Sequence, residues 1–123
     1  MTEELVTLET AKLLKEKGFN EPCMIAMNIE DGRQYGTNRT NSKLPIKVCS
    51  HPTQSVAQKW LRETKNIHIC VYSCACGYGY EISKADNGTH IASSVYKGTN
   101  DGGKWDTYEE ALEAGLQEAL KLI

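Results

Sequence analysis

Residues 67–97 read IHICVYSCACGYGYEISKADNGTHIASSVYK, with apolar and aromatic side chains recurring at every second position. This spacing predicts half-buried strands over Ile67 to Ser73, Tyr78 to Ala85 and His90 to Lys97. Asn87-Gly88, between the last two segments, is the dipeptide most typical of a two-residue hairpin turn. The three segments are therefore expected to form an antiparallel meander.

A closing helix follows this meander. Thr107, with Glu110 three residues later, matches a capping box. Apolar side chains and one glycine then recur on one helical face: Tyr108, Ala111, Leu112, Gly115, Leu116, Ala119, Leu120 and Ile123. A glycine inside a helix costs about 1 kcal/mol relative to alanine. Gly115 therefore indicates a close backbone approach, either to the sheet or to another subunit.

Two further helices are expected before the meander. The first runs from Thr7 to about Lys17, with Thr7 as its N-cap. Gly18 stands where a left-handed residue ends a helix. The second begins near Pro52 or Thr53 and ends around Lys65, with Asn66 as its stop.

The segment between these two helices predicts short strands and a loop. Apolar residues alternate over Cys23 to Ile29, and Asp31-Gly32 then supplies a turn, which indicates a strand entering a hairpin. Gly36 to Lys43 is polar and is expected to be an exposed loop. A short strand-like run follows at Leu44 to Cys49.

These elements predict an α+β fold, a small antiparallel sheet of three to five strands packed with three helices in the order α-β-β-α-β-β-β-α. No repeat or long linker interrupts the 123 residues, so residues 1–123 are expected to form a single domain. Hydrophobic residues at 40% and charged residues at 24% match soluble globular chains and argue against disordered, collagen-like and membrane proteins.

The start of the chain and the cysteine count bear on its compartment. Met1 to Val6 lacks the basic start and apolar stretch of a secretory signal, so a cytoplasmic location without membrane association is expected. The five cysteines are an odd number and are expected to be reduced there.

The densest group of potential metal ligands is His68, Cys70, Cys74 and Cys76. Zinc needs four such ligands in tetrahedral geometry, and a turn near Gly77 would have to fold these side chains together. Neighbours two apart on a strand project in parallel instead. The alternative is a strand that packs its thiols against a helix, because free cysteine is among the most buried residue types.

Two enzymatic interpretations have weaker support. A cysteine nucleophile could pair with His51, His68 or His90, but nothing in the sequence selects a pair. Gly98 to Lys104 matches the first part of a phosphate-binding loop, but Trp105 stands where a hydroxyl would bind magnesium. This segment is expected to be a flexible connection.

Residues 32–62 carry six basic side chains and no carboxylate. The second helix places Gln54, Gln58 and Arg62 at i, i+4 and i+8, opposite an apolar stripe that contains Trp60. Such a face could bind nucleic acid. The candidate residues are Gln54, Gln58, Lys59 and Arg62, with the loop cations Arg39 and Lys43. The net charge of −2 favours the alternative of an ordinary solvated face.

Several segments carry a family resemblance: residues 9–19 (ETAKLLKEKGF), 52–55 (PTQS), 58–63 (QKWLRE), 66–69 (NIHI) and 108–120 (YEEALEAGLQEAL). In these the chain resembles a family of short uncharacterised proteins of Bacteroides-type gut bacteria, often carried in phage or other mobile DNA. The cysteine group is not part of that family's pattern. The resemblance implies a cytoplasmic host or phage protein and implies no activity, substrate or catalytic residue.

Three functions remain open from the sequence. The first is a non-enzymatic accessory domain without a cofactor, acting through a protein partner or through self-association. The second is a nucleic-acid-binding module whose binding weakens with salt and is lost on charge reversal at Lys59 and Arg62. The third is a zinc or cysteine site at Cys70 to Cys76.

Overall fold

The computed structural model describes residues 4–75, 77–94 and 104–123. The chain divides into two compact units, Met1–Ala57 and Gln58–Ile123, and each is described by itself. The boundary falls inside one helix, α2 (Gln54–Thr64). The expectation of a single domain stays a prediction.

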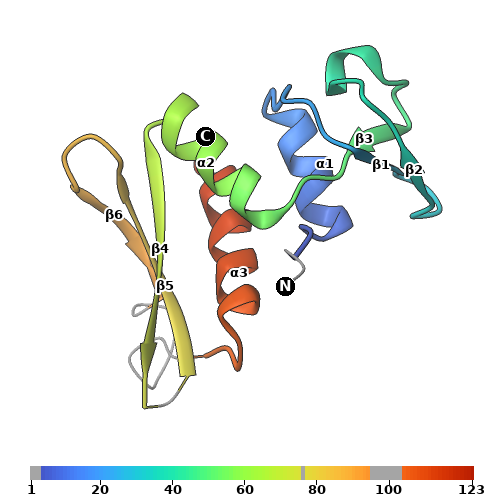
Figure 1. The fold of residues 1–123 in the computed structure, drawn as a ribbon. Helices are drawn as coiled ribbons and strands as arrows, with labels where there is room; N and C mark the ends of the chain where they lie inside the picture. The colour runs from blue at the N-terminus through green and yellow to red at the C-terminus, as the bar shows by residue number, and fades with distance from the viewer. Residues whose placement is uncertain (1–3, 76, 95–103) are drawn as a thin grey trace. The chain divides into compact units, whose positions relative to one another are not determined.

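The first unit combines one helix, a three-stranded sheet and the first turn of α2 (Figure 1). Its strands are antiparallel in the order β2-β1-β3. The elements are α1 (Leu8–Glu16), β1 (Ile25–Asn28), β2 (Gln34–Gly36), the 3-10 helix η1 (Asn41–Lys43) and β3 (Val48–Ser50).

Both ends of α1 form as the sequence predicts. The Thr7 hydroxyl accepts a hydrogen bond from the Thr10 N–H at 3.3 Å, which satisfies one of the free donors of the first turn. Gly18 has a φ of 93° after the helix end, a conformation that favours glycine. The N–H of buried Phe19 then bonds back to the Leu14 carbonyl at 2.9 Å.

The hairpin after α1 is confirmed, but the loop that follows it differs from the expectation. Gly32 has a φ of 72° in the turn between β1 and β2. Within the loop predicted to be exposed, Asn41 is buried. Its side chain donates to the Phe19 carbonyl and accepts from the Ser50 N–H, both at 2.8 Å. This amide connects the end of α1 to β3. The sequence of the loop alone does not predict these long-range contacts.

The second unit is a three-stranded antiparallel sheet with α3 along one face (Figure 1). The strands have the order β4-β5-β6, and this confirms the predicted meander. The elements are the rest of α2, β4 (Ile67–Cys74), β5 (Gly77–Lys84), β6 (His90–Ser93) and α3 (Tyr108–Lys121). The end of the expected third strand, residues 95–97, lies outside the described residues.

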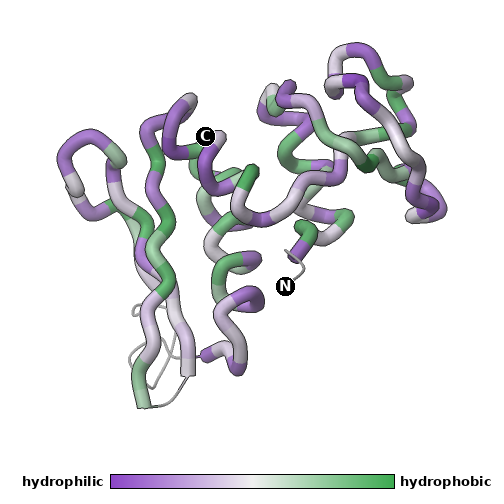
Figure 2. Tube along the Cα trace, viewed as in Figure 1, coloured by the Kyte–Doolittle hydropathy of each residue, from purple (hydrophilic) through white to green (hydrophobic). Residues whose placement is uncertain are grey.

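Turn residues and caps of the second unit also agree with the sequence. Asn66 ends α2 with a φ of 59°, and Gly88 has a φ of 75° between β5 and β6. The loop is longer than the expected two-residue turn, because residues 85–89 separate the two strands. That turn is hydrophilic in Figure 2. The Thr107 hydroxyl accepts from the Glu110 N–H at 3.1 Å, as the capping box predicts.

The core of the second unit lies between α3 and the sheet. Hydrophobic and hydrophilic positions alternate along α3 (Figure 2), and its buried side includes Leu116. A Cβ added to Gly115 would lie 2.9 Å from Cγ2 of Ile69 and 3.2 Å from Cγ of Tyr80. Of the two explanations for this glycine, the close approach to the sheet is the one observed.

The α+β class and the predicted order of helices and strands are confirmed, with three strands rather than two between α1 and α2. The strands form two sheets of three rather than one. Among the described residues, no helix combines the length and the apolar character needed to cross a membrane.

Candidate interaction surface

In the segments that the structure describes, β4 forms one edge of its sheet, because the strand order gives it a partner on one side only. It pairs with β5 over all eight residues without a register shift. Its sequence, IHICVYSC, holds no Lys, Arg, Asp, Glu, Pro or Gly. Natural edge strands are normally shortened, bulged or marked by such residues, because a plain edge invites another strand to pair.

The opposite edge of the same sheet is protected in the usual way. The strand β6 has four residues, and its register against β5 shifts between Ile82 and Ser83. The strands of the other sheet have three or four residues each. Within the described segments, β4 is therefore the edge strand that offers the longest regular row of backbone groups.

The direction of each backbone group in β4 follows from the hydrogen bonds around it. In an antiparallel pair, opposed residues alternate between bonding to each other and pointing away. The Ala85 N–H bonds to the Asn66 carbonyl just before β4 begins, so the even-numbered residues of β4 bond to β5. The odd-numbered residues point outward. We call the N–H and C=O groups of Ile67, Ile69, Val71 and Ser73 the β4 edge.

Contacts of β5 support this assignment. Lys84 and Tyr80 stand opposite Ile67 and Val71. Their N–H groups bond away from β4, Lys84 to the Thr89 carbonyl at 2.8 Å and Tyr80 to the Ser94 hydroxyl at 2.9 Å.

One side chain occupies part of the β4 edge. The Gln58 amide Nε2 donates to the Ile69 carbonyl at 2.7 Å. Farther along, the Cys70 thiol lies 3.9 Å from the Val71 carbonyl, which is at most a weak contact. In the described part of the chain, no backbone partner bonds to the N–H or C=O of Val71 or Ser73 outside the strand ladder. These four groups are the available portion of the β4 edge.

The sheet face opposite α3 carries the alternate side chains of β4. Because Ile67 and Ile69 are buried on the α3 side, His68, Cys70 and Tyr72 project to the other face. The Tyr72 hydroxyl lies 3.2 Å from that of Ser94, so its ring reaches across β5 rather than over the edge. Gly79, which has no side chain, stands opposite Tyr72.

The three described residues of the predicted zinc site do not cluster around one point. His68, Cys70 and Cys74 follow one another along one strand, and Cys76 lies outside the described residues. No group of three His, Cys, Asp or Glu side chains within the described ranges is placed to hold a metal ion. Nδ1 of His68 is buried and has no hydrogen-bond partner among the described residues.

Two other cysteines lack the character of an activated nucleophile. Burial raises the pKa of the Cys49 thiol, although Lys15 and Lys12 act against the shift. Burial likewise raises the pKa of Cys23. A raised pKa favours the protonated thiol, whereas a nucleophile needs the thiolate. His51 is buried, with its ring nitrogens 2.5 Å from the Val6 carbonyl and 3.1 Å from Gln34 Nε2.

The predicted nucleic-acid face on α2 is only partly exposed. The expectation that Gln54 lies on a solvated face is wrong, because it is 5% exposed and its N–H bonds to the Glu4 carbonyl. Gln58 bonds to the sheet edge. Lys59 and Arg62 are exposed. The helix is rotated relative to the prediction, since Val56 from the expected apolar stripe is 38% exposed.

The loop cations Arg39 and Lys43 are exposed in the first unit, whereas Lys59 and Arg62 belong to the second. The prediction that they bind nucleic acid together stays a prediction. In the phosphate-loop segment, Gly98 to Gly103 lie outside the described residues.

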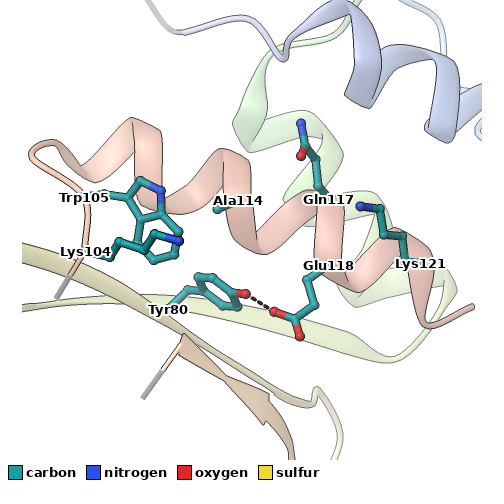
Figure 3. Close-up of a pocket in the computed structure, with 7 residues that line it drawn as sticks. All are labelled: Tyr80, Lys104, Trp105, Ala114, Gln117, Glu118 and Lys121. Carbon is teal, nitrogen blue, oxygen red and sulfur yellow. Dashed lines mark hydrogen bonds between the residues drawn. The ribbon is translucent and has the colours of Figure 1, made fainter. Parts of the chain in front are cut away.

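Lys104 borders a hollow of about 250 Å³ between Trp105, Tyr80 and α3 (Figure 3). Its ammonium group lies 5.6 Å from the centre of the Trp105 ring. The Tyr80 hydroxyl donates to the Glu118 carboxylate. Desolvation raises the pKa of Glu118, and nearby Lys121 opposes that shift. With ammonium and carboxylate groups both present, the hollow favours no single ligand charge.

The β4 edge thus lacks the features that normally keep an edge strand from pairing with another chain. Its signal in the sequence is the run of eight residues without charge, proline or glycine. A scan against family models and searches of curated proteins and of solved structures give no match for this chain.

Proposed function

We propose that this chain is a non-enzymatic protein-interaction domain and that the available portion of the β4 edge receives an extended strand of its partner. The observation that carries the proposal is the long, regular and uncharged edge of β4. The resemblance to phage and mobile-element proteins supports an accessory role of this kind.

Strand addition uses the main chain for affinity and the side chains for specificity. Val71 and Ser73 offer two donors and two acceptors, and each resulting hydrogen bond contributes about 0.5–1.5 kcal/mol. The total from four such bonds lies below the association cost of ~4–15 kcal/mol or only at its lower end. The partner must therefore also bury side chains of β4, and half-buried Val71 and exposed Ser73 are accessible for that contact.

The proposal is tested by removing one donor of the edge. Ser73→Pro deletes an N–H that points away from β5, so the ladder inside the sheet keeps its bonds. Ser73→Ala is the matched control, because it removes the hydroxyl and keeps the N–H. Ser73 is exposed, and neither change alters the core.

A partner is first identified by affinity capture from cells that make the protein, and is then purified. Titration with the purified partner should show binding about tenfold weaker or worse for Ser73→Pro than for Ser73→Ala. Equal thermal melting of the two variants shows that the fold is intact. Equal affinity of the two variants would contradict the proposal.

A further inference from the structure

We infer that the strand received at the β4 edge is β4 of a second copy of this chain, in an antiparallel pair about a twofold axis at Tyr72. This inference rests on the proposed function and identifies its partner. The resulting sheet has six strands in the order β6-β5-β4-β4-β5-β6.

The composition of β4 suits pairing with itself. Around a twofold axis every residue meets a residue of the same strand, so charged side chains close to the axis bring like charges together. The strand carries no Lys, Arg, Asp or Glu, and it therefore contains no repulsion against its own copy. The same neutrality gives a foreign strand no charge to recognise.

The hydrogen-bond pattern selects the position of the axis. An axis at Tyr72 pairs Val71 with Ser73 of the second copy, and Ser73 with Val71 of the second copy. Both pairs use only outward-pointing groups. An axis at Val71 or at Cys70 would require the Ile69 carbonyl, which Gln58 already occupies. An axis beyond Tyr72 would pair Val71 with residues outside β4.

The face opposite α3 allows this approach. The Tyr72 ring points across β5 toward Ser94, away from the edge, and so leaves the axis open. Cys70 comes opposite Cys74 of the second copy in a pair without mutual hydrogen bonds. Such pairs have a Cα separation of about 4.5 Å, which lies inside the range that a disulfide spans, about 4.4–6.8 Å.

This geometry gives a register-specific test by thiol crosslinking. In a Cys23→Ser, Cys76→Ser background, one variant carries Cys74→Ser and retains Cys70, and another carries Cys70→Ser and retains Cys74. Diamide accepts two electrons and two protons as it joins two thiols into a disulfide. Buried Cys49 remains in both variants, and a variant lacking Cys70 and Cys74 controls for it.

Each variant alone should stay monomeric on a non-reducing gel, and their mixture should give a covalent dimer. A covalent dimer from the Cys70 variant alone would place the axis at Cys70 and overturn the assignment. No covalent dimer from the mixture would overturn the pairing of β4 with β4.

A second pair of variants tests the same contact without oxidation. Cys70→Lys with Cys74→Lys opposes like charges across the axis, and Cys70→Lys with Cys74→Glu opposes unlike charges. Sedimentation equilibrium should give a dimer dissociation constant at least about tenfold higher for the first variant than for the second. Equal constants would overturn the inference.

The self-pairing and the proposed function can fail separately. If the parent chain is monomeric but a different protein still needs the Ser73 N–H for binding, the self-pairing fails and the proposed function stands. If neither binding event depends on that N–H, both fail.

Discussion

The side-chain amide of Gln58, on α2, donates a hydrogen bond to the backbone carbonyl of Ile69, on β4, at 2.7 Å. This bond occupies one outward acceptor of an otherwise plain edge strand. It leaves Val71 and Ser73 as the groups that can meet another strand, and so it limits where a partner can pair.

Gln58→Ala removes that bond and leaves the Ile69 carbonyl to water. The free energy of unfolding should fall by about 0.5–1.5 kcal/mol, the usual net value of such a bond. Urea denaturation measures the loss. Lys59→Ala, next to it on the same helix and exposed, should change stability by less than about 0.5 kcal/mol. Equal effects of the two substitutions would show that the bond contributes nothing.

Gly115→Ala should destabilise the protein although it improves helix propensity. The propensity gain is about 1 kcal/mol, while overpacking a core costs about 1–3 kcal/mol. The added Cβ would lie 2.9 Å from Cγ2 of Ile69, so we expect a net loss of about 1–2 kcal/mol. In an Ile69→Ala background the same substitution should cost less. A gain in stability from Gly115→Ala alone would mean that helix and sheet separate easily.

Thr107→Ala removes the hydroxyl that accepts the Glu110 N–H. The expected loss of stability is about 1 kcal/mol, as for other N-cap residues. Thr107→Ser keeps the acceptor and should retain most of the stability. Thermal unfolding of the three proteins makes the comparison, and a serine variant as unstable as the alanine variant would argue against capping.

The stability contribution of Glu118 should depend on pH. Its folded pKa is raised, chiefly by desolvation, so the folded state binds the proton more tightly than the unfolded state. Stability therefore falls as the pH rises from the ordinary value of 4.5 through the raised pKa. Glu118→Gln should be at least as stable as the parent at pH 7, and its advantage should shrink in acid. An advantage that grows in acid would contradict the shift.

Features set by neighbouring residues could be predicted from the sequence. The left-handed residues Gly18 and Asn66, the cap at Thr107 and the place of the turn at Gly88, though not its length, all follow from local backbone chemistry. The close approach at Gly115 could also be predicted, since a glycine in a strong helix is otherwise unfavourable.

Features set by distant residues could not be predicted in this way. Asn41 is buried because it bonds to residues on both sides of the loop, 22 positions before it and 9 after it. Gln54 is buried because the rotation of α2 depends on tertiary packing and not on the helical period alone. The β4 edge follows from the order of strands in the sheet, and a local sequence pattern does not predict that order.

The most direct test of the central claim is amide hydrogen exchange, measured by NMR at increasing protein concentration. The Tyr72 amide bonds to β5 and should be protected at every concentration. If two copies pair through the β4 edge, the Val71 and Ser73 amides should gain protection as the concentration rises. Fast exchange of both amides at every concentration would contradict the claim.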